Sequence, residues 1–283
     1  MDIADAGQWI ADALAPFRSG ARPAADRSTV AASLPDRFEA YARILHPVNR
    51  EDGTPLTWSE IARKTGRAVH PCAQFAAVAG IAYGDPLVLD GKYLHVPREG
   101  ELDAAQLAAL ATILGEHTGT PRDVYLALWD GYGWIHGAGA VSVLWSVDEP
   151  ETPSAEFQEE QAALLAQVKR LQEPSFPYEV LNGTLLDVGH GFRQYFVFRG
   201  TITDLAHPPW AEGRTLNTQT PNLAWPADHA WCLATEIDFD STLAGGTREA
   251  IDAVVRSPLL EALPVTPATS LAWDADTVNP RVP

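Results

Sequence analysis

Three dipeptides of the Asp-Gly or Asn-Gly type constrain the fold of this chain more than any other feature of its sequence. Asp90-Gly91, Asp130-Gly131 and Asn182-Gly183 each stand between two apolar runs. Because both central residues of a type I′ turn need positive φ, which Asn, Asp and Gly tolerate, such a dipeptide favours a two-residue β-hairpin. The sequence therefore predicts antiparallel pairing through much of the chain.

Helical patterns occur between these hairpins and do not alternate one for one with strands. Residues 103–117 carry leucines three and four positions apart, and 154–171 is acidic first and basic last, as the helix dipole favours. Thr57 is a candidate N-cap, with Glu60 at the capping-box position. The expected helices cover residues 1–19, 57–65, 103–117, 154–171 and 247–256, and further strands are expected at 38–47, 141–146, 194–199 and 230–237. This segregation predicts the α+β class with a largely antiparallel sheet.

The length of the chain allows either one large core or two smaller ones. It has 283 residues, of which 46% are hydrophobic. The Pro-rich stretch at 148–153 is the expected linker between an N-terminal part, 1–147, and a C-terminal part, 154–283, which either fold separately or share one core. The tail after Leu263 is expected to be extended and peripheral.

Charge restricts the partners of the protein. The sequence has 37 acidic and 20 basic residues, and its formal net charge of -17 repels nucleic acid and anionic membranes. We therefore expect a protein, a peptide or a small molecule as the partner, and no nucleic acid. No apolar run reaches about 18 residues, and the N-terminus carries acids where a signal peptide carries bases, so a cytoplasmic protein without membrane association is expected.

Carboxylates late in the sequence are candidate catalytic groups. If residues 230–237 form a strand, its two-residue period places Glu236 and Asp238 on one face, about 7 Å apart. Such a pair could bind a divalent cation or act as an acid and a base, although a solvated sheet face explains the same residues. Asp240 completes a DFDST pattern that matches the DxDxT nucleophile motif of haloacid dehalogenase-type phosphatases. No lysine follows position 169, so phosphatase chemistry of that type is not expected.

Histidines give a second set of candidates. His46 and His70 each precede a proline, His117 lies at the end of a predicted helix, and His229 lies between two tryptophans. Together they could ligate a metal or shuttle protons, whereas imidazoles hydrogen-bonded to the backbone at turns explain the same positions. No HxxxH or HExxH spacing is present and the two cysteines lie far apart, so no metal site is predicted, and the sequence leaves open whether the protein uses a cofactor.

Aromatic residues gather beside these acids, within residues 221–247. Tryptophans build cores, but they also line grooves for peptides and flat ligands. Trp225 is flanked by polar residues and a proline, which predicts an exposed loop at a binding surface. The candidate ligand-binding residues are Asn222, Trp225, Asp228, His229, Trp231 and, beside the Asp130-Gly131 turn, Trp129.

Four blocks of the sequence resemble a known family. They are FEAYARILHP at 38–47, GRAVHPCAQF at 66–75, EHTGTP with LALWDGYG within 116–133, and PNLAWPADHAWCLATEIDFDSTLAGG at 221–246. They are similar to the HPxxQF, FAxWEGxG and NLWWPxDRAWCVATEID-like blocks of an uncharacterised bacterial family that is frequent in actinobacteria. The chain departs from that pattern at Ala224, Asp130 and His229, where the family has Trp, Glu and Arg. The resemblance implies one architecture over most of the chain and a bacterial origin, and it implies no particular reaction.

Two hypotheses of function remain. The first is a binding protein that recognises a protein, a peptide or a small molecule through an acidic, Trp-lined surface near residues 225–240. The second is a hydrolase or metal-assisted enzyme that uses the clustered acids together with histidines such as His46 and His70. The second hypothesis requires these side chains to converge on one cavity, whereas dispersed histidines would favour binding.

Overall fold

The structure, a computed structural model, describes residues 2–19, 21–137, 173–189, 191–211, 219–280 and 282. It divides into two units, one made of Met1–Leu128 with Leu185–Pro283 and the other of Trp129–Thr184. The strand predicted at 141–146, the linker at 148–153 and the helix at 154–171 lie outside the described residues.

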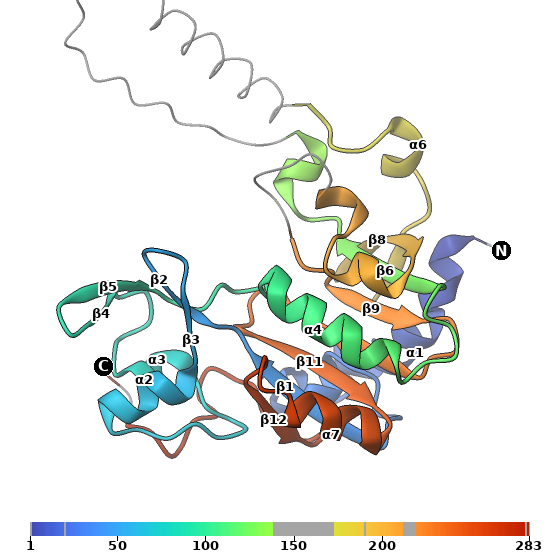
Figure 1. Cartoon of the computed structure of the whole chain (residues 1–283). Coiled ribbons are helices and arrows are strands. Elements are labelled where there is room, and N and C mark those ends of the chain that lie inside the picture. The colour runs from blue at the N-terminus through green and yellow to red at the C-terminus, as the bar shows by residue number, and fades with distance from the viewer. Residues whose placement is uncertain are drawn as a thin grey trace, which may run out of the picture. The chain divides into compact units, whose positions relative to one another are not determined.

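An eight-stranded sheet forms the centre of the larger unit, in the order β12-β1-β11-β10-β9-β6-β8-β7 (Figure 1). The strands are β1 (Ala40–Leu45), β6 (Val124–Trp129), β7 (Leu186–Val188), β8 (Arg193–Gly200), β9 (Leu223–Pro226), β10 (Trp231–Ala234), β11 (Ser241–Gly246) and β12 (Ala262–Val265). β1 pairs antiparallel with β11 and β12, and the antiparallel pairing continues from β11 through β10 and β9 to β6. The predicted α+β class with an antiparallel sheet is confirmed.

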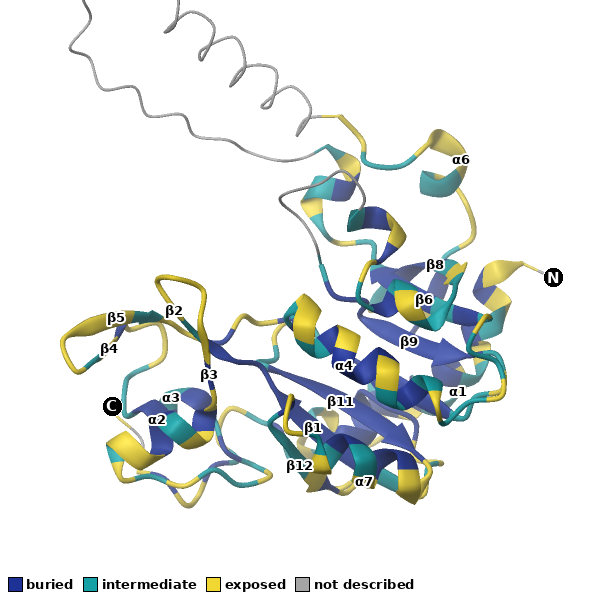
Figure 2. Ribbon diagram, in the orientation of Figure 1, coloured by how far each residue is buried: buried dark blue, intermediate teal, exposed yellow. Residues whose placement is uncertain are grey.

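Helices cover this sheet with apolar faces. α4 (Ala104–Gly115) and α7 (Arg248–Arg256) lie side by side, and α7 packs on β1, β11 and β12 (Figure 1). Figure 2 shows dark blue, buried residues on both helices, and these include Leu107, Leu110 and Leu114 of α4 and Ile251 and Val254 of α7. α1 (Gln8–Arg18) packs against β7. The helices predicted at the N-terminus, at 103–117 and at 247–256 are confirmed.

Short 3-10 helices join these elements. They are η1 (Ile3–Gly7), η2 (Ala24–Ser28), η3 (Val30–Ala32), η4 (Gly133–His136), η5 (Ile202–Leu205) and η6 (Pro209–Ala211). Among the residues that the structure describes, every helix is too short or too polar to span a bilayer.

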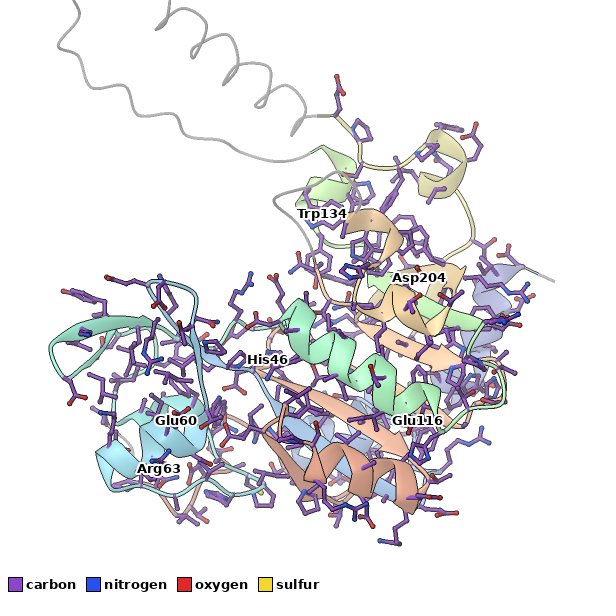
Figure 3. The ribbon with its side chains drawn as sticks, viewed as in Figure 1. His46, Glu60, Arg63, Glu116, Trp134 and Asp204 are labelled. Atoms are coloured by element: carbon purple, nitrogen blue, oxygen red, sulfur yellow. The ribbon has the colours of Figure 1, made fainter. Side chains whose placement is uncertain are left out.

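A second, four-stranded sheet has the order β3-β2-β5-β4. Its strands are β2 (Val48–Arg50), β3 (Pro55–Leu56), β4 (Leu87–Leu89) and β5 (Lys92–His95), and it shares a hydrophobic core with α2 (Trp58–Thr65) and α3 (Phe75–Ala79). The predicted capping box begins α2, since the Thr57 side chain accepts from the Glu60 N–H and the Glu60 carboxylate accepts from the Thr57 N–H. Glu60 is labelled in Figure 3.

One of the three predicted hairpins forms. Asp90 and Gly91 have φ values of 52° and 73° and join β4 to β5. The other two predictions are wrong, because neither Asp130-Gly131 nor Asn182-Gly183 adopts positive φ. β6 continues into η4, and Asn182 ends the short helix α6 (Tyr178–Leu181), which begins after a proline.

Two features of the last third of the chain complete the fold. Gly245 and Gly246 belong to β11, and Thr247 is the N-cap of the helix that follows. A Cβ on Gly245 would come within 2.5 Å of a Leu34 methyl, so close packing and not a turn explains this glycine. The tail is not peripheral, because β12 pairs with β1 and both Asp276 and Asn279 are buried.

Candidate functional site

A cavity of about 860 Å³ lies where β1, through Arg43, and four further segments of the larger unit meet. The segment 74–85 contains α3, 96–99 follows β5, 238–241 connects β10 to β11, and 271–282 belongs to the C-terminal tail. Polar, charged and aromatic side chains make up much of the cavity lining. They are Arg43, Gln74, Phe75, Tyr83, Asp85, Glu99, Asp238, Phe239, Asp240, Ser241, Trp273 and Asp276.

Arg43 and Asp240 form an ion pair in the cavity wall. Arg43 stands in β1, its side chain is buried, and its Nη2 lies 3.1 Å from Asp240 Oδ1. Its Nε donates to Ser241 Oγ at 2.9 Å, and its Nη1 donates to the carbonyl oxygens of Pro71 at 3.1 Å and Ala73 at 2.8 Å. The guanidinium group is therefore held by four hydrogen bonds, which fix its position and neutralise its charge.

Burial raises the pKa of Asp240, while the neighbouring Arg43 guanidinium lowers it. The first effect is the larger, so the net shift is upward. The Asp240 side chain nevertheless retains 20% of its exposure and lines the cavity. Asp240 is thus a carboxyl group of raised pKa that is accessible from the cavity.

Aromatic side chains surround the cavity mouth. Tyr83 and Trp273 are 83% and 78% exposed, and both line the cavity together with Phe75 and Phe239. The Tyr83 hydroxyl donates to Glu99 Oε1 at 3.0 Å, a hydrogen bond that raises the pKa of Tyr83. Large exposed rings at the rim of a cavity give flat contact area for a ligand at low cost in conformational entropy.

Gln74 contributes a buried polar atom to the same cavity. Its Nε2 has no hydrogen-bond partner among the residues that the structure describes. A buried amide donor without an acceptor costs about 1–3 kcal/mol of folding free energy. A polar atom of a ligand placed beside Gln74 would remove that cost.

Asp276 fixes the C-terminal tail as a wall of the cavity. Its carboxylate accepts from His70 Nε2 at 2.9 Å, from the Gln74 N–H at 3.2 Å, from the Val278 N–H at 3.1 Å, and from the N–H and Nδ2 of Asn279 at 2.9 Å each. Burial opposes ionisation, but the hydrogen bonds from Asn279, His70 and Gln74 outweigh it and lower the pKa of Asp276 to about 2.

Asp276→Asn is therefore expected to loosen the tail and to lower the free energy of unfolding by about 2 kcal/mol at pH 7. The folded pKa lies below the ordinary value, so the stabilisation is present above pH 4 and is lost as the pH falls through about 2. Hydrogen exchange of residues 270–280 measures the effect. Asp274→Asn, an exposed neighbour, is the control, and equal exchange in the two variants would contradict the assignment.

The predicted acids divide into two groups. Asp238 and Asp240 line the cavity, whereas Glu236 is not among its lining residues. The prediction of a strand through Ile237 is wrong, because β10 ends at Ala234 and the acids lie in the loop that follows. Glu236 is 3.5 Å from both Arg18 and Arg193, and Arg193 is also 3.5 Å from Asp238. The two arginines compensate the negative charge of Glu236, so no ligand is needed to neutralise it.

The predicted histidines do not converge. His46 (labelled in Figure 3) is fully buried between β1 and β2, and its Nδ1 lies 2.6 Å from the Arg98 carbonyl oxygen. A carbonyl oxygen only accepts, so Nδ1 carries the proton and Nε2 accepts from the Thr242 hydroxyl at 3.0 Å. Burial lowers the pKa of His46 to about 4, so it is neutral at pH 7. His70 contacts Asp276 instead, and neither histidine lines the cavity.

A metal site is not formed by these groups. Within the described ranges, no three His, Cys, Asp or Glu side chains are grouped so that they could hold a metal ion. His117 lies beyond the end of α4, where its backbone N–H donates to the Leu114 carbonyl.

The predicted aromatic loop is a buried strand. Trp225 belongs to β9 and is fully buried, so its expected placement at the surface is wrong. Its ring stacks on Tyr125 of the adjacent β6, with centroids 5.6 Å apart, because the two residues are partners in the strand register. Trp231 is fully buried in β10, and the buried Asn222 side chain donates to the Thr235 carbonyl at 3.1 Å.

The remaining predicted ligand-binding residues contact other parts of the protein and do not line the cavity. Asp228 accepts from the Gly119 N–H at 2.6 Å and from the Thr118 hydroxyl at 2.9 Å. His229 stacks on Trp9 with centroids 4.5 Å apart. Trp129 packs edge to face on Tyr132 within the smaller unit.

Several residues that line the cavity were not predicted, among them Arg43, Gln74, Tyr83, Glu99 and Trp273. The sequence does contain a signal for Arg43, because this arginine is the one charged residue within the apolar run that forms β1. A charged residue in a buried strand needs a fixed counter-charge, which can come only from elsewhere in the fold. The other four lie in segments without any periodic pattern.

Comparisons with known proteins assign no function to this cavity. No protein-family model matches the chain, and neither the comparison with curated proteins nor the comparison with solved structures gives a significant match.

Proposed function

We propose that this protein is a binding protein for a small molecule and that the cavity beside Arg43 and Asp240 is its binding site. The observation that carries the proposal is the cavity itself. Its volume of about 860 Å³ falls in the range of small-molecule sites, roughly 300–1,000 Å³. It combines apolar and aromatic walls with a few fixed polar groups, which is the composition by which such sites give both affinity and orientation.

The arrangement of titratable groups favours binding over the alternative, a hydrolase or metal-assisted enzyme. Asp238 and Asp240 reach the cavity, but no histidine or cysteine is among the described residues that line it. His46 is held neutral between a carbonyl and a hydroxyl, and His70 is held by Asp276. An acid and a base placed at one reacting atom would require a different arrangement of these side chains.

A fragment screen with a matched pair of variants tests this proposal. Tyr83 and Tyr178 are both strongly exposed tyrosines, at 83% and 75%, and only Tyr83 lines the cavity. A library of small-molecule fragments is screened by ligand-observed NMR against the wild-type chain and both variants. We expect Tyr83→Ala to weaken the fragments that bind by about tenfold, because it removes one ring of the mouth, and Tyr178→Ala to have no effect. The proposal fails if no fragment binds, or if both variants bind every fragment equally well.

A further inference from the structure

We propose that the ligand of this cavity is an organic cation, an ammonium or guanidinium group on an apolar body. This inference rests on the proposed function, because it names the chemical class that the same site recognises. It depends on three features of the cavity, namely its charge, its aromatic rim and its apolar wall.

Charge is the first feature. Five carboxylates line the cavity, those of Asp85, Glu99, Asp238, Asp240 and Asp276, against the single guanidinium of Arg43. Arg43 is already paired with Asp240, and Asp276 is paired with His70. Asp238 shares Arg193 with Glu236, at 3.5 Å from each, and Asp85 and Glu99 form no ion pair with a base of the described residues. A cation entering the cavity would be attracted, whereas an anion would be repelled.

The aromatic rim is the second feature. The faces of aromatic rings carry negative quadrupole potential, and a cation placed over such a face within about 6 Å is attracted to it. Tyr83 and Trp273 present strongly exposed rings among the lining residues, and the Tyr83 hydroxyl lies 3.0 Å from Glu99 Oε1. Aromatic rings and carboxylates at the same opening bind ammonium groups, because both kinds of group partly replace the water that the cation loses on binding.

The apolar wall is the third feature. Phe75, Ile81, Val96 and Leu271 line the cavity together with alanines of α3 and the following loop. A simple inorganic cation would leave these groups in contact with water. An organic cation with an aromatic or aliphatic body buries them.

The electrostatic field of the whole protein acts in the same direction. The formal net charge of -17 raises the local concentration of cations near the surface and accelerates their association. Because this long-range part is screened by salt, the preference for a cation should weaken as ionic strength rises.

Three probes that differ in charge and share a body test the inference: 4-phenylbutylamine, 4-phenylbutanol and 4-phenylbutyrate. Binding to the full chain at pH 7.5 is followed by tryptophan fluorescence excited at 295 nm, where the probes do not absorb and Trp273 reports from the mouth. We expect the amine to bind roughly tenfold more tightly than the alcohol at low salt, and the carboxylate to bind most weakly. The ratio of amine to alcohol should fall as salt is added.

Variants that each remove one carboxylate test whether the acids of the cavity cause the preference for the amine over the alcohol. Asp238→Asn and Glu99→Gln should each weaken the amine by roughly threefold to tenfold and leave the alcohol unchanged. Asp252→Asn is the matched control, because Asp252 lies on α7, outside the cavity, where its ion pair with Arg256 is exposed. Equal losses in all three variants would show that only the overall charge matters, which would overturn the assignment of the cation to this mouth.

The outcomes separate this inference from the proposed function. If the alcohol binds as tightly as the amine, and Tyr83→Ala weakens both, the cavity is a binding site but its ligand is not a cation. If none of the three probes binds, or if Tyr83→Ala leaves their binding unchanged, the inference of a cationic ligand is overturned, and the fragment screen decides separately whether this cavity is a binding site. Preferential binding of the amine that depends on Asp238, Glu99 and Tyr83 supports both.

Discussion

Arg43→Met is expected to lower the free energy of unfolding by about 3–5 kcal/mol, as measured by urea denaturation at pH 7.5. The reason is the position of Arg43 in β1, where one guanidinium satisfies Asp240, Ser241 and two backbone carbonyls. Methionine fills a similar volume but donates no hydrogen bond. It leaves a mostly buried carboxylate without a counter-charge and two carbonyl oxygens without donors.

Arg256→Met is the matched control for this prediction. Arg256 also pairs with an aspartate, Asp252, but at 3.9 Å and with both side chains exposed. Its loss should change the free energy of unfolding by less than about 0.5 kcal/mol. If the Arg43→Met chain does not fold, the double variant Arg43→Met/Asp240→Asn should recover part of the loss, because the unpaired charge is then absent. Equal stability of the two arginine variants would show that the buried pair contributes nothing.

Acidification from pH 7 to pH 4 is expected to cost about 3 kcal/mol of folding stability through His46 alone. In the unfolded chain this imidazole titrates near its ordinary value of 6.5, whereas burial lowers its folded pKa to about 4. Between these values the unfolded chain binds a proton that the folded chain does not. The stability is therefore fully present above pH 6.5, and it falls as the pH decreases toward 4.

Urea unfolding of the wild type and of His46→Gln between pH 7.5 and pH 4 measures this contribution. The wild type should lose stability with a slope that approaches about 1.4 kcal/mol per pH unit, and the variant should lose most of that slope. Other groups act in the same interval, and carboxylates with lowered pKa values such as Glu60 add to the loss near pH 4. His229, whose pKa is also lowered by burial, adds to the loss, and Asp240, whose pKa is raised, opposes it. Parallel pH profiles for wild type and His46→Gln would exclude His46 as the cause.

The sequence was sufficient to predict those elements that are stabilised by residues close together in the chain. The capping box at Thr57 and the Asp90-Gly91 turn depend on residues within a few positions of each other, and both form as predicted. Asp130-Gly131 and Asn182-Gly183 carry the same turn chemistry, but their backbones take other conformations. A turn dipeptide permits positive φ and does not impose it, so the pairing of the flanking strands decides the outcome.

The candidate site was only partly accessible from the sequence, and Trp225 shows why. Its polar neighbours suggested an exposed loop, whereas β9 is an inner strand between β10 and β6 and the Trp225 side chain is fully buried against Tyr125. Asp240 was predicted, but its partner Arg43 is almost 200 positions away and its cavity is closed by the tail. Burial and ion pairing between distant segments depend on the tertiary fold, which residue spacing in one chain does not encode.

The position of β1 has a consequence for how the protein is made. This strand is complete by Leu45, yet its two sheet neighbours are β11 and β12, which end at Gly246 and Val265. At about 5–20 residues per second, a ribosome needs roughly 10–40 seconds to supply them after β1 emerges. Throughout that interval the apolar strand has neither partner, which exposes both of its edges to other chains. Expression at low temperature or with added chaperones is therefore expected to raise the soluble yield, and the yield in the supernatant after lysis measures it.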